Sequence, residues 1–84
     1  MGISYTKHAQ KKFVDLAVFG IKITKSRIRA VVDKPKYQLV DNGNKIAVGA
    51  FDNKHNLRVI FKKEKGDIII ITFYIYRKGR YGEY

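Results

Sequence analysis

The sequence predicts a small α+β domain, and two observations carry this prediction. Apolar residues follow helical spacing up to about residue 33, and from Lys36 onward they alternate with a period of two. The composition also fits a folded domain, since 45% of the 84 residues are hydrophobic and there is one proline. A chain of this length buries only about 60% of its unfolded surface. We therefore expect residues 1–84 to form a single domain around one modest core.

The N-terminal segment predicts a short strand followed by a helix. Residues 3–5 alternate in polarity and form a run as short as many edge strands. Ser4 or Thr6 can cap a helix at about 7–19, in which apolar side chains recur at helical spacing. Gly20 is well placed to end that helix, because glycine readily adopts the left-handed conformation of a helix C-terminus.

A second, shorter helix is predicted at about 25–33. Thr24 is a suitable N-cap for it, and the Asp-Lys-Pro sequence at 33–35 ends it, because the residue before a proline disfavours helical backbone. Only a few residues join the two predicted helices. We therefore expect them to pair with each other as a helix hairpin.

Four strands are expected after the helices, at about 37–40, 45–51, 57–62 and 68–76. Asn-Gly at 42–43 is the preferred centre of a tight type I′ turn, which predicts a hairpin between the first two of them. The last strand is apolar on both faces and should lie in the middle of the sheet, next to the N-terminal strand. The expected order is β-α-α-β-β-β-β, with the helix hairpin on one face of a mainly antiparallel sheet.

The charge balance is the strongest global signal, with 18 basic against 7 acidic residues and a formal net charge of +11. RNA, DNA, the ribosome or a strongly acidic protein are the natural complements of such a surface, and a merely solvated basic surface is the alternative. The chain has no cysteine and only two distant histidines, so we expect neither a metal nor another cofactor. No stretch approaches the roughly 20 apolar residues of a membrane helix. We expect a soluble, cytoplasmic protein without a membrane partner.

The third and fourth of these strands suggest a basic and aromatic face. If Leu57 and its alternate neighbours face the helices, Arg58 and Lys62 project from the opposite face. Tyr74 and Tyr76 of the next strand can share that face. Cations suit phosphates and aromatic rings suit unstacked bases, so the combination indicates RNA. The alternative is that the rings cover exposed sheet and Arg58 stacks on them.

Several segments resemble a known family. An arginine inside the penultimate strand (LRVIFKK) and a basic, tyrosine-bearing end after the last strand (ITFYIYRKGRYGEY) are similar to the RelE/ParE toxin superfamily. The segments SYTKHAQKKF, GIKIT and DKP resemble an uncharacterised branch of it with a histidine on the first helix. The resemblance implies a RelE-like toxin that cleaves messenger RNA on the ribosome without a metal. It also implies an acidic antitoxin protein as partner.

The resemblance places the family's arginines at Arg58 and Arg77, and its terminal tyrosine at Tyr81 or Tyr84. Two guanidinium groups can stabilise the charge that develops when a 2′-oxygen attacks phosphorus. A tyrosine among cations can serve as the base, and His8 is the other candidate for proton transfer. Helix-cap surroundings and simple solvation explain His8 equally well. The further residues expected to bind RNA are Lys45, Lys62, Tyr74, Tyr76, Lys78 and Arg80.

One departure from the family pattern keeps other functions open. The family often carries two lysines at alternate positions of an earlier strand, where this chain has Lys45 but Ala47. This difference favours a non-catalytic, ParE-like toxin or an RNA- or ribosome-binding module, so enzymatic activity is left open. His55 is expected in a turn and is interpreted as structural or inert.

Overall fold

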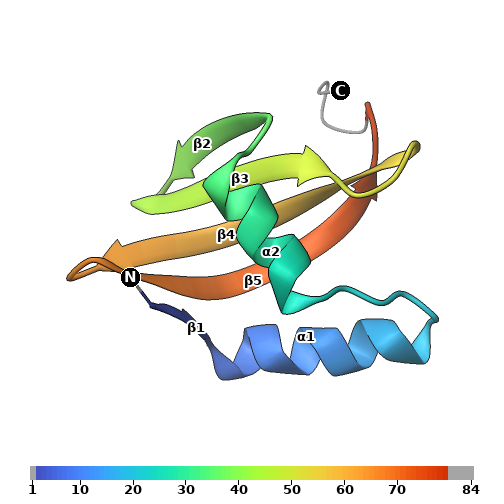
Figure 1. The fold of residues 1–84 in the computed structure, drawn as a ribbon, viewed down its shortest axis with the longest axis horizontal. Coiled ribbons are helices and arrows are strands. Elements are labelled where there is room, and N and C mark those ends of the chain that lie inside the picture. Colours follow the sequence, from blue (N-terminus) through green and yellow to red (C-terminus); the bar gives the residue numbers. More distant parts are fainter. Residues whose placement is uncertain (1, 80–84) are drawn as a thin grey trace.

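The computed structural model describes residues 2–79 and shows two helices packed on a five-stranded mixed sheet (Figure 1). The element order agrees with the predicted one. The elements are β1 (Ile3–Tyr5), α1 (Lys7–Val18), α2 (Lys25–Asp33), β2 (Tyr37–Asp41), β3 (Asn44–Ala50), β4 (His55–Glu64) and β5 (Asp67–Arg77).

The strands lie in the order β1-β5-β4-β3-β2. β1 runs parallel to β5, and the other three pairings are antiparallel. As predicted, the apolar last strand is an inner strand with the N-terminal strand beside it. The central position, however, belongs to β4, because β1 occupies the outer edge of β5.

The first helix begins at Thr6, one of its two candidate caps, and the second begins at Thr24 as predicted. The side chain of Thr6 accepts a hydrogen bond from the backbone N–H of Ala9 at 3.1 Å, and Thr24 accepts one from Arg27 at 3.1 Å. These bonds satisfy N–H groups that have no partner within the helix itself. α1 ends one residue earlier than expected, and Gly20 follows with a φ of +79° that other residues adopt at a cost.

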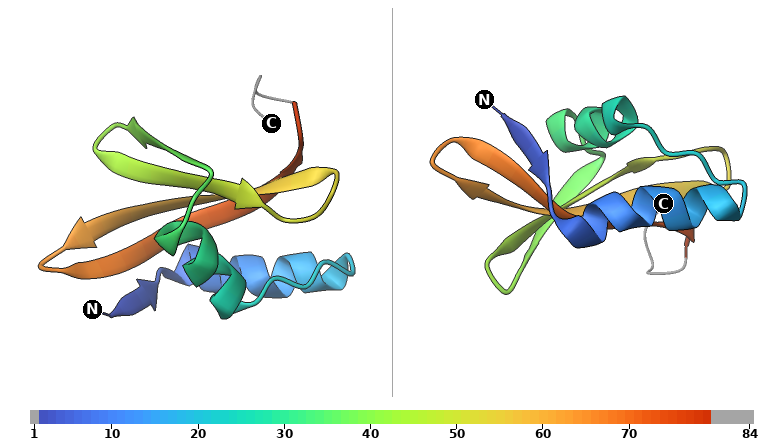
Figure 2. Two further views of the ribbon diagram at one scale, coloured as in Figure 1. Left: turned by 45° about the horizontal axis from the view of Figure 1, so that its top comes forward. Right: turned by 90° about the horizontal axis from the view of Figure 1, so that it is seen from below.

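The predicted helix hairpin is wrong, although both helices pack on the sheet. α1 contacts β5 and β1, whereas α2 contacts β3 and β4, and no close backbone contact joins α1 to α2 in the part of the chain described. Figures 1 and 2 show α1 running along β5 while α2 crosses over the middle strands. Both helices contribute buried residues to the core on this face of the sheet, among them Ala9 of α1 and Ile28 of α2.

The core has two parts, one on each face of the sheet. On the face that carries the helices, Leu57, Val59 and Phe61 of β4 are buried together with residues of both helices and Phe73 of β5. The residues of the opposite cluster are Ile46, Val48 and Tyr76, with Tyr37, Ile60 and Tyr74 packed against them. The alternation of β4 between the two faces confirms the assignment made from its sequence.

Turns and one irregularity fix the registers. Asn42 and Gly43 both have positive φ, at 52° and 82°, as the predicted type I′ turn requires. In the β4–β5 ladder, Ile60 pairs with Thr72 and Phe61 with Ile70, so Ile71 forms a bulge. Its carbonyl accepts a hydrogen bond from the hydroxyl of Thr6 at 2.8 Å, which ties the start of α1 to the bulge.

Candidate nucleic-acid interface

The sheet face opposite the helices carries an arginine between an apolar and an aromatic side chain. Arg58 lies directly opposite Tyr74 of β5 on one side and Val48 of β3 on the other. Side chains in such cross-strand positions have Cβ atoms about 4.5–5.5 Å apart. Arg58 and Tyr74 are each half-buried, so part of each side chain reaches solvent. We call the surface formed by Tyr37, Arg58, Tyr74 and Tyr76 the tyrosine face.

α1 adds a cation to the edge of the tyrosine face. The ammonium nitrogen of Lys12 lies 5.7 Å from the centroid of the Tyr74 ring, within the range of a cation–π interaction. His8 precedes Lys12 by four residues, so the two side chains lie on the same side of α1, one turn apart. His8 is exposed. The helix therefore brings an imidazole to the same border of the sheet as Lys12.

The tyrosines differ in accessibility. Tyr76 is only 3% exposed, and its hydroxyl lies 3.3 Å from that of Tyr37. A ring this buried has no face available for stacking a base, although the sequence placed Tyr76 among the RNA-binding residues. Tyr74 lies 6.5 Å from Tyr76, ring centroid to centroid, and is supported by it from within the sheet. Tyr37 and Tyr74 are the half-buried rings of this face.

Arg77 does not share this face with Arg58. It pairs with His55 at the end of the β4–β5 ladder and follows Ile75, which packs against the helix-side core. Because side chains alternate along a strand, the Cβ of Arg77 points to the helix-bearing face and that of Arg58 to the tyrosine face. The two arginine side chains that we expected to hold one phosphodiester together thus start from opposite faces of the sheet.

His8 is also distant from Arg77. Thr6, the N-cap of α1, hydrogen-bonds to Ile70 and Ile71 in the middle of β5. Arg77 lies six residues beyond Ile71, or about 20 Å along the strand at roughly 3.3 Å per residue. His8 is therefore associated with Lys12 and the tyrosine face, and Arg77 with the far end of the sheet.

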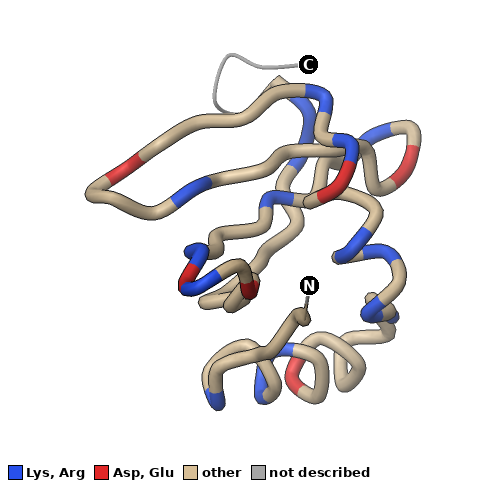
Figure 3. The backbone as a smooth tube through the Cα atoms, turned by 60° about the vertical axis from the view of Figure 1, so that its left-hand side comes forward, with Lys and Arg blue, Asp and Glu red and all other residues tan. Residues whose placement is uncertain are grey.

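The other predicted residues are dispersed. Lys45 pairs with the core residue Phe61 and so extends from the helix-bearing face. Lys62 is exposed on the tyrosine face, where its ammonium lies 3.4 Å from the carboxylate of Glu64. Lys78 follows β5, and its backbone N–H donates to the carbonyl of Lys54. Arg80, Tyr81 and Tyr84 lie outside the described residues. Figure 3 shows lysines and arginines on helices, strands and turns alike.

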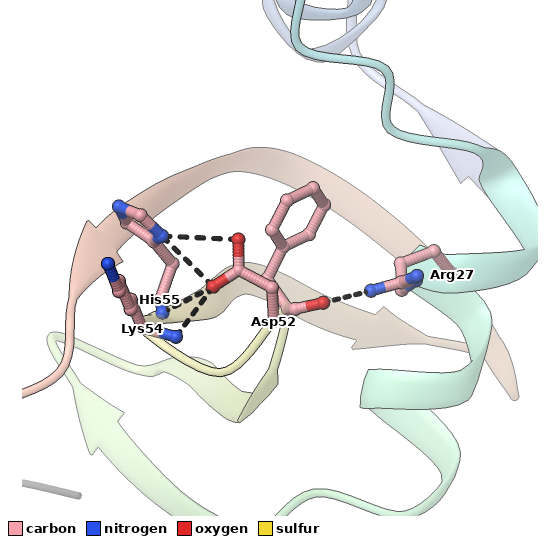
Figure 4. A network of polar contacts seen from close by, with 5 residues as sticks. Arg27, Asp52, Lys54 and His55 are labelled. Carbon is pink, nitrogen blue, oxygen red and sulfur yellow. Dashed lines mark hydrogen bonds and ion pairs between the residues drawn. The ribbon is translucent and has the colours of Figure 1, made fainter.

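The sequence analysis missed a polar cluster at the β3–β4 turn (Figure 4). Asp52 accepts hydrogen bonds from the backbone N–H groups of Lys54 and His55, and its two oxygens lie 3.0 and 3.2 Å from Nδ1 of His55. The hydrogen bond from the backbone of Lys54 is the main cause that lowers the pKa of Asp52. The Asp-x-x-His spacing at 52–55 was the available signal, but it gained meaning only once the turn was seen to bring the carboxylate to the imidazole.

A hollow lies at the opposite end of the molecule, between β1 and the start of α2. Burial raises the pKa of Tyr5, which lies in it, while the nearby charge of Arg29 acts in the opposite direction. The lining residues are Gly2, Ile3, Tyr5, Lys25, Ser26 and Arg29, none of them among the predicted site residues.

Two further findings concern metals and membranes. Within residues 2–79, no three His, Asp or Glu side chains gather where they could ligate a metal ion. None of the helices described is long and apolar enough to cross a bilayer.

Comparison with family models, with curated proteins and with solved structures finds no match to this chain. The resemblance to the RelE/ParE toxins therefore stays a prediction.

Proposed function

We propose that the protein binds single-stranded RNA through the tyrosine face. The observation that carries this proposal is the cross-strand pair of Arg58 and Tyr74, with Lys12 beside it. A guanidinium can take a phosphate bidentately, and the neighbouring ring can stack on an unpaired base. The net charge of +11 provides the long-range attraction.

The partly buried positions of these side chains support binding of a flexible strand. Arg58 and Tyr74 project from neighbouring inner strands, so the backbone holds them at a fixed separation. A phosphate and its adjacent base are joined covalently and can occupy both at once. A duplex keeps its bases stacked inside, so it can use Arg58 but not Tyr74 in this way.

The proposal is tested by measuring the affinity for a short single-stranded RNA at several salt concentrations, by fluorescence anisotropy. Arg58→Gln is expected to weaken binding by at least about tenfold, because the charge-assisted hydrogen bonds of the guanidinium to the phosphate are lost. It should also reduce the slope of log affinity against log salt by about 0.7, the value for one phosphate contact on a single strand. Tyr74→Leu should weaken binding through lost stacking and leave the slope unchanged.

The matched control is Arg29→Gln, which removes the same charge from an exposed position of α2. It should change the affinity by less than about twofold. If Arg58→Gln and Arg29→Gln weaken binding equally, the protein attracts RNA by net charge alone and the tyrosine face is not the site.

A second candidate is the RelE-like toxin, a metal-independent endoribonuclease acting on messenger RNA. What favours it is the position of His8, one helical turn from Lys12 at the border of the tyrosine face. In this version His8 takes the proton of a 2′-hydroxyl, the 2′-oxygen bonds to the adjacent phosphorus, and Arg58 stabilises the negative charge on the phosphate. The bond between phosphorus and the 5′-oxygen breaks, the 5′-oxygen takes a proton from water, and the products are a 2′,3′-cyclic phosphate and a 5′-hydroxyl. Arg77 has no part in the step, since it lies on the other face of the sheet.

Cleavage of RNA or of ribosome-bound messenger in the presence of a chelator is the test of this candidate. His8→Gln should abolish cleavage while RNA binding persists. His55→Gln is the control and should still cleave RNA. Growth inhibition on expression with DNA damage and intact RNA would instead identify a ParE-like toxin. A short acidic protein encoded in the neighbouring reading frame would support either kind of toxin, as its antitoxin.

A further inference from the structure

A second polar site lies at the end of the sheet where β3 turns into β4 and where β5 ends. Its members are Asp52 and His55 of the turn and Arg77 of β5. Neither the RNA-binding proposal nor the endoribonuclease candidate uses them as a site. Arg77 entered the sequence analysis only as a partner of Arg58, and His55 only as a turn residue.

The turn fixes the imidazole of His55 in one orientation. Oδ1 of Asp52 accepts from the backbone N–H groups of Lys54 at 2.8 Å and His55 at 2.7 Å, which holds the carboxylate in the turn. The same carboxylate lies 3.0 Å from Nδ1 of His55, so Nδ1–H donates to it (Figure 4). Nε2 is on the other side of the ring and remains available to a ligand. The His55 side chain is 39% exposed, so a ligand can reach it.

β5 places an arginine directly opposite His55 in the sheet. Arg77 is the cross-strand partner of His55, and both extend from the same face of the sheet. Arg77 is exposed. One residue farther, the backbone N–H of Lys78 donates to the carbonyl of Lys54 at 2.9 Å. The backbone pairing therefore continues beyond Arg77 and holds the two segments together. The charged residues next to His55 in the turn and across the ladder are thus Asp52, Lys54 and Arg77, and Lys78 follows at the end of β5.

We propose that His55 and Arg77, with Asp52 orienting the imidazole, form a binding site for a phosphate group. A guanidinium offers two parallel N–H donors to phosphate oxygens, and a protonated imidazole adds a third through Nε2. The ligand class is a phosphate ester, either a monoester such as a nucleotide or the diester of a nucleic-acid backbone.

This site goes beyond the proposed function and does not depend on it. It lies on the helix-bearing face, whereas Arg58 and Tyr74 lie on the other. Loss of RNA binding on changing the tyrosine face would leave this site intact. A change of Arg77 that abolishes phosphate binding would likewise leave the tyrosine face intact, so the two proposals can fail separately.

The test is an NMR titration of the intact protein with inorganic phosphate at constant ionic strength. The two histidines provide an internal control, since Thr6, two residues before His8, is bound to Ile71, which lies about 20 Å along β5 from Arg77. The ring signals of His55 and the amide signal of Lys54 should shift and saturate, while those of His8 should not. Equal or unsaturable shifts at both histidines would overturn the proposal.

Variants then separate a site from a general effect of charge. Arg77→Gln should weaken phosphate binding about 10- to 100-fold, as expected for charge-assisted hydrogen bonds, whereas Arg29→Gln should change it less than about twofold. Equal effects of the two variants would refute the site. Uridine 5′-monophosphate and a uridine dinucleotide with only a diester phosphate distinguish the two possible sources. Tighter binding of the first identifies a monoester as the ligand, and tighter binding of the second identifies a backbone phosphate.

Discussion

Gly49 of β3 lies close against Val31 of α2, and an alanine at position 49 provides a sharp test of the fold. A Cβ at position 49 would lie 3.0 Å from Cγ2 and 3.4 Å from Cγ1 of Val31. Carbon atoms in ordinary contact are about 3.5–4.0 Å apart. Val31 is 5% exposed and lies within a helix, where a β-branched side chain has one preferred rotamer, so it cannot turn away.

We expect Gly49→Ala to destabilise the protein by about 1–3 kcal/mol, the usual cost of overpacking a core by one methyl group. In a domain of this size each kcal/mol lowers the melting temperature by about 4–8 °C. Thermal and urea unfolding, followed by circular dichroism, measure the change. A shift of α2 away from the sheet would also disturb the hydrogen bond from the guanidinium of Arg27 to the carbonyl of Phe51.

A double-mutant cycle isolates the cause. In a Val31→Ala background the crowding atoms are gone, so adding Gly49→Ala should be neutral or stabilise by about 0.4–1 kcal/mol, because alanine restricts the unfolded chain. The change of sign between the two backgrounds is the specific expectation. An equal effect in both backgrounds, or stabilisation by Gly49→Ala alone, would show that α2 does not rest on β3 through Val31.

Two further predictions concern the start of α1 and the β3–β4 turn. Thr6→Val removes both the cap of Ala9 and the hydrogen bond to the bulge carbonyl of Ile71, and should cost about 1–3 kcal/mol in urea unfolding, whereas Thr6→Ser should cost much less. The pKa of Asp52 is lowered in the folded protein, chiefly because the backbone N–H of Lys54 donates a hydrogen bond to its carboxylate. The ionised carboxylate therefore stabilises the fold above the pKa that Asp52 has in the unfolded chain. This stabilisation is lost as the pH falls through the pKa of Asp52 in the folded protein. The stability of Asp52→Asn should therefore fall less on acidification below about pH 4 than that of the native protein. Parallel pH profiles for the two proteins would contradict this.

The sequence by itself determined the local structure, because the forces concerned act over a few residues. Threonine caps, the Asn-Gly turn and the change from helical to alternating periodicity fixed every element to within about two residues. The assignment of Leu57 and Arg58 to opposite faces also follows from local geometry, since neighbouring side chains of a strand point in opposite directions. These features need no knowledge of what lies beside each element.

Tertiary structure decided which residues became neighbours. Register depends on contacts between segments far apart in the chain, such as the bond of Thr6 to the bulge at Ile71, and no local pattern encodes it. That register sets Arg58 opposite Tyr74 and His55 opposite Arg77, and so produces two polar sites on opposite faces where one had been expected. The helices likewise pack on the sheet instead of on each other, and their apolar side chains are buried there against apolar residues of the strands.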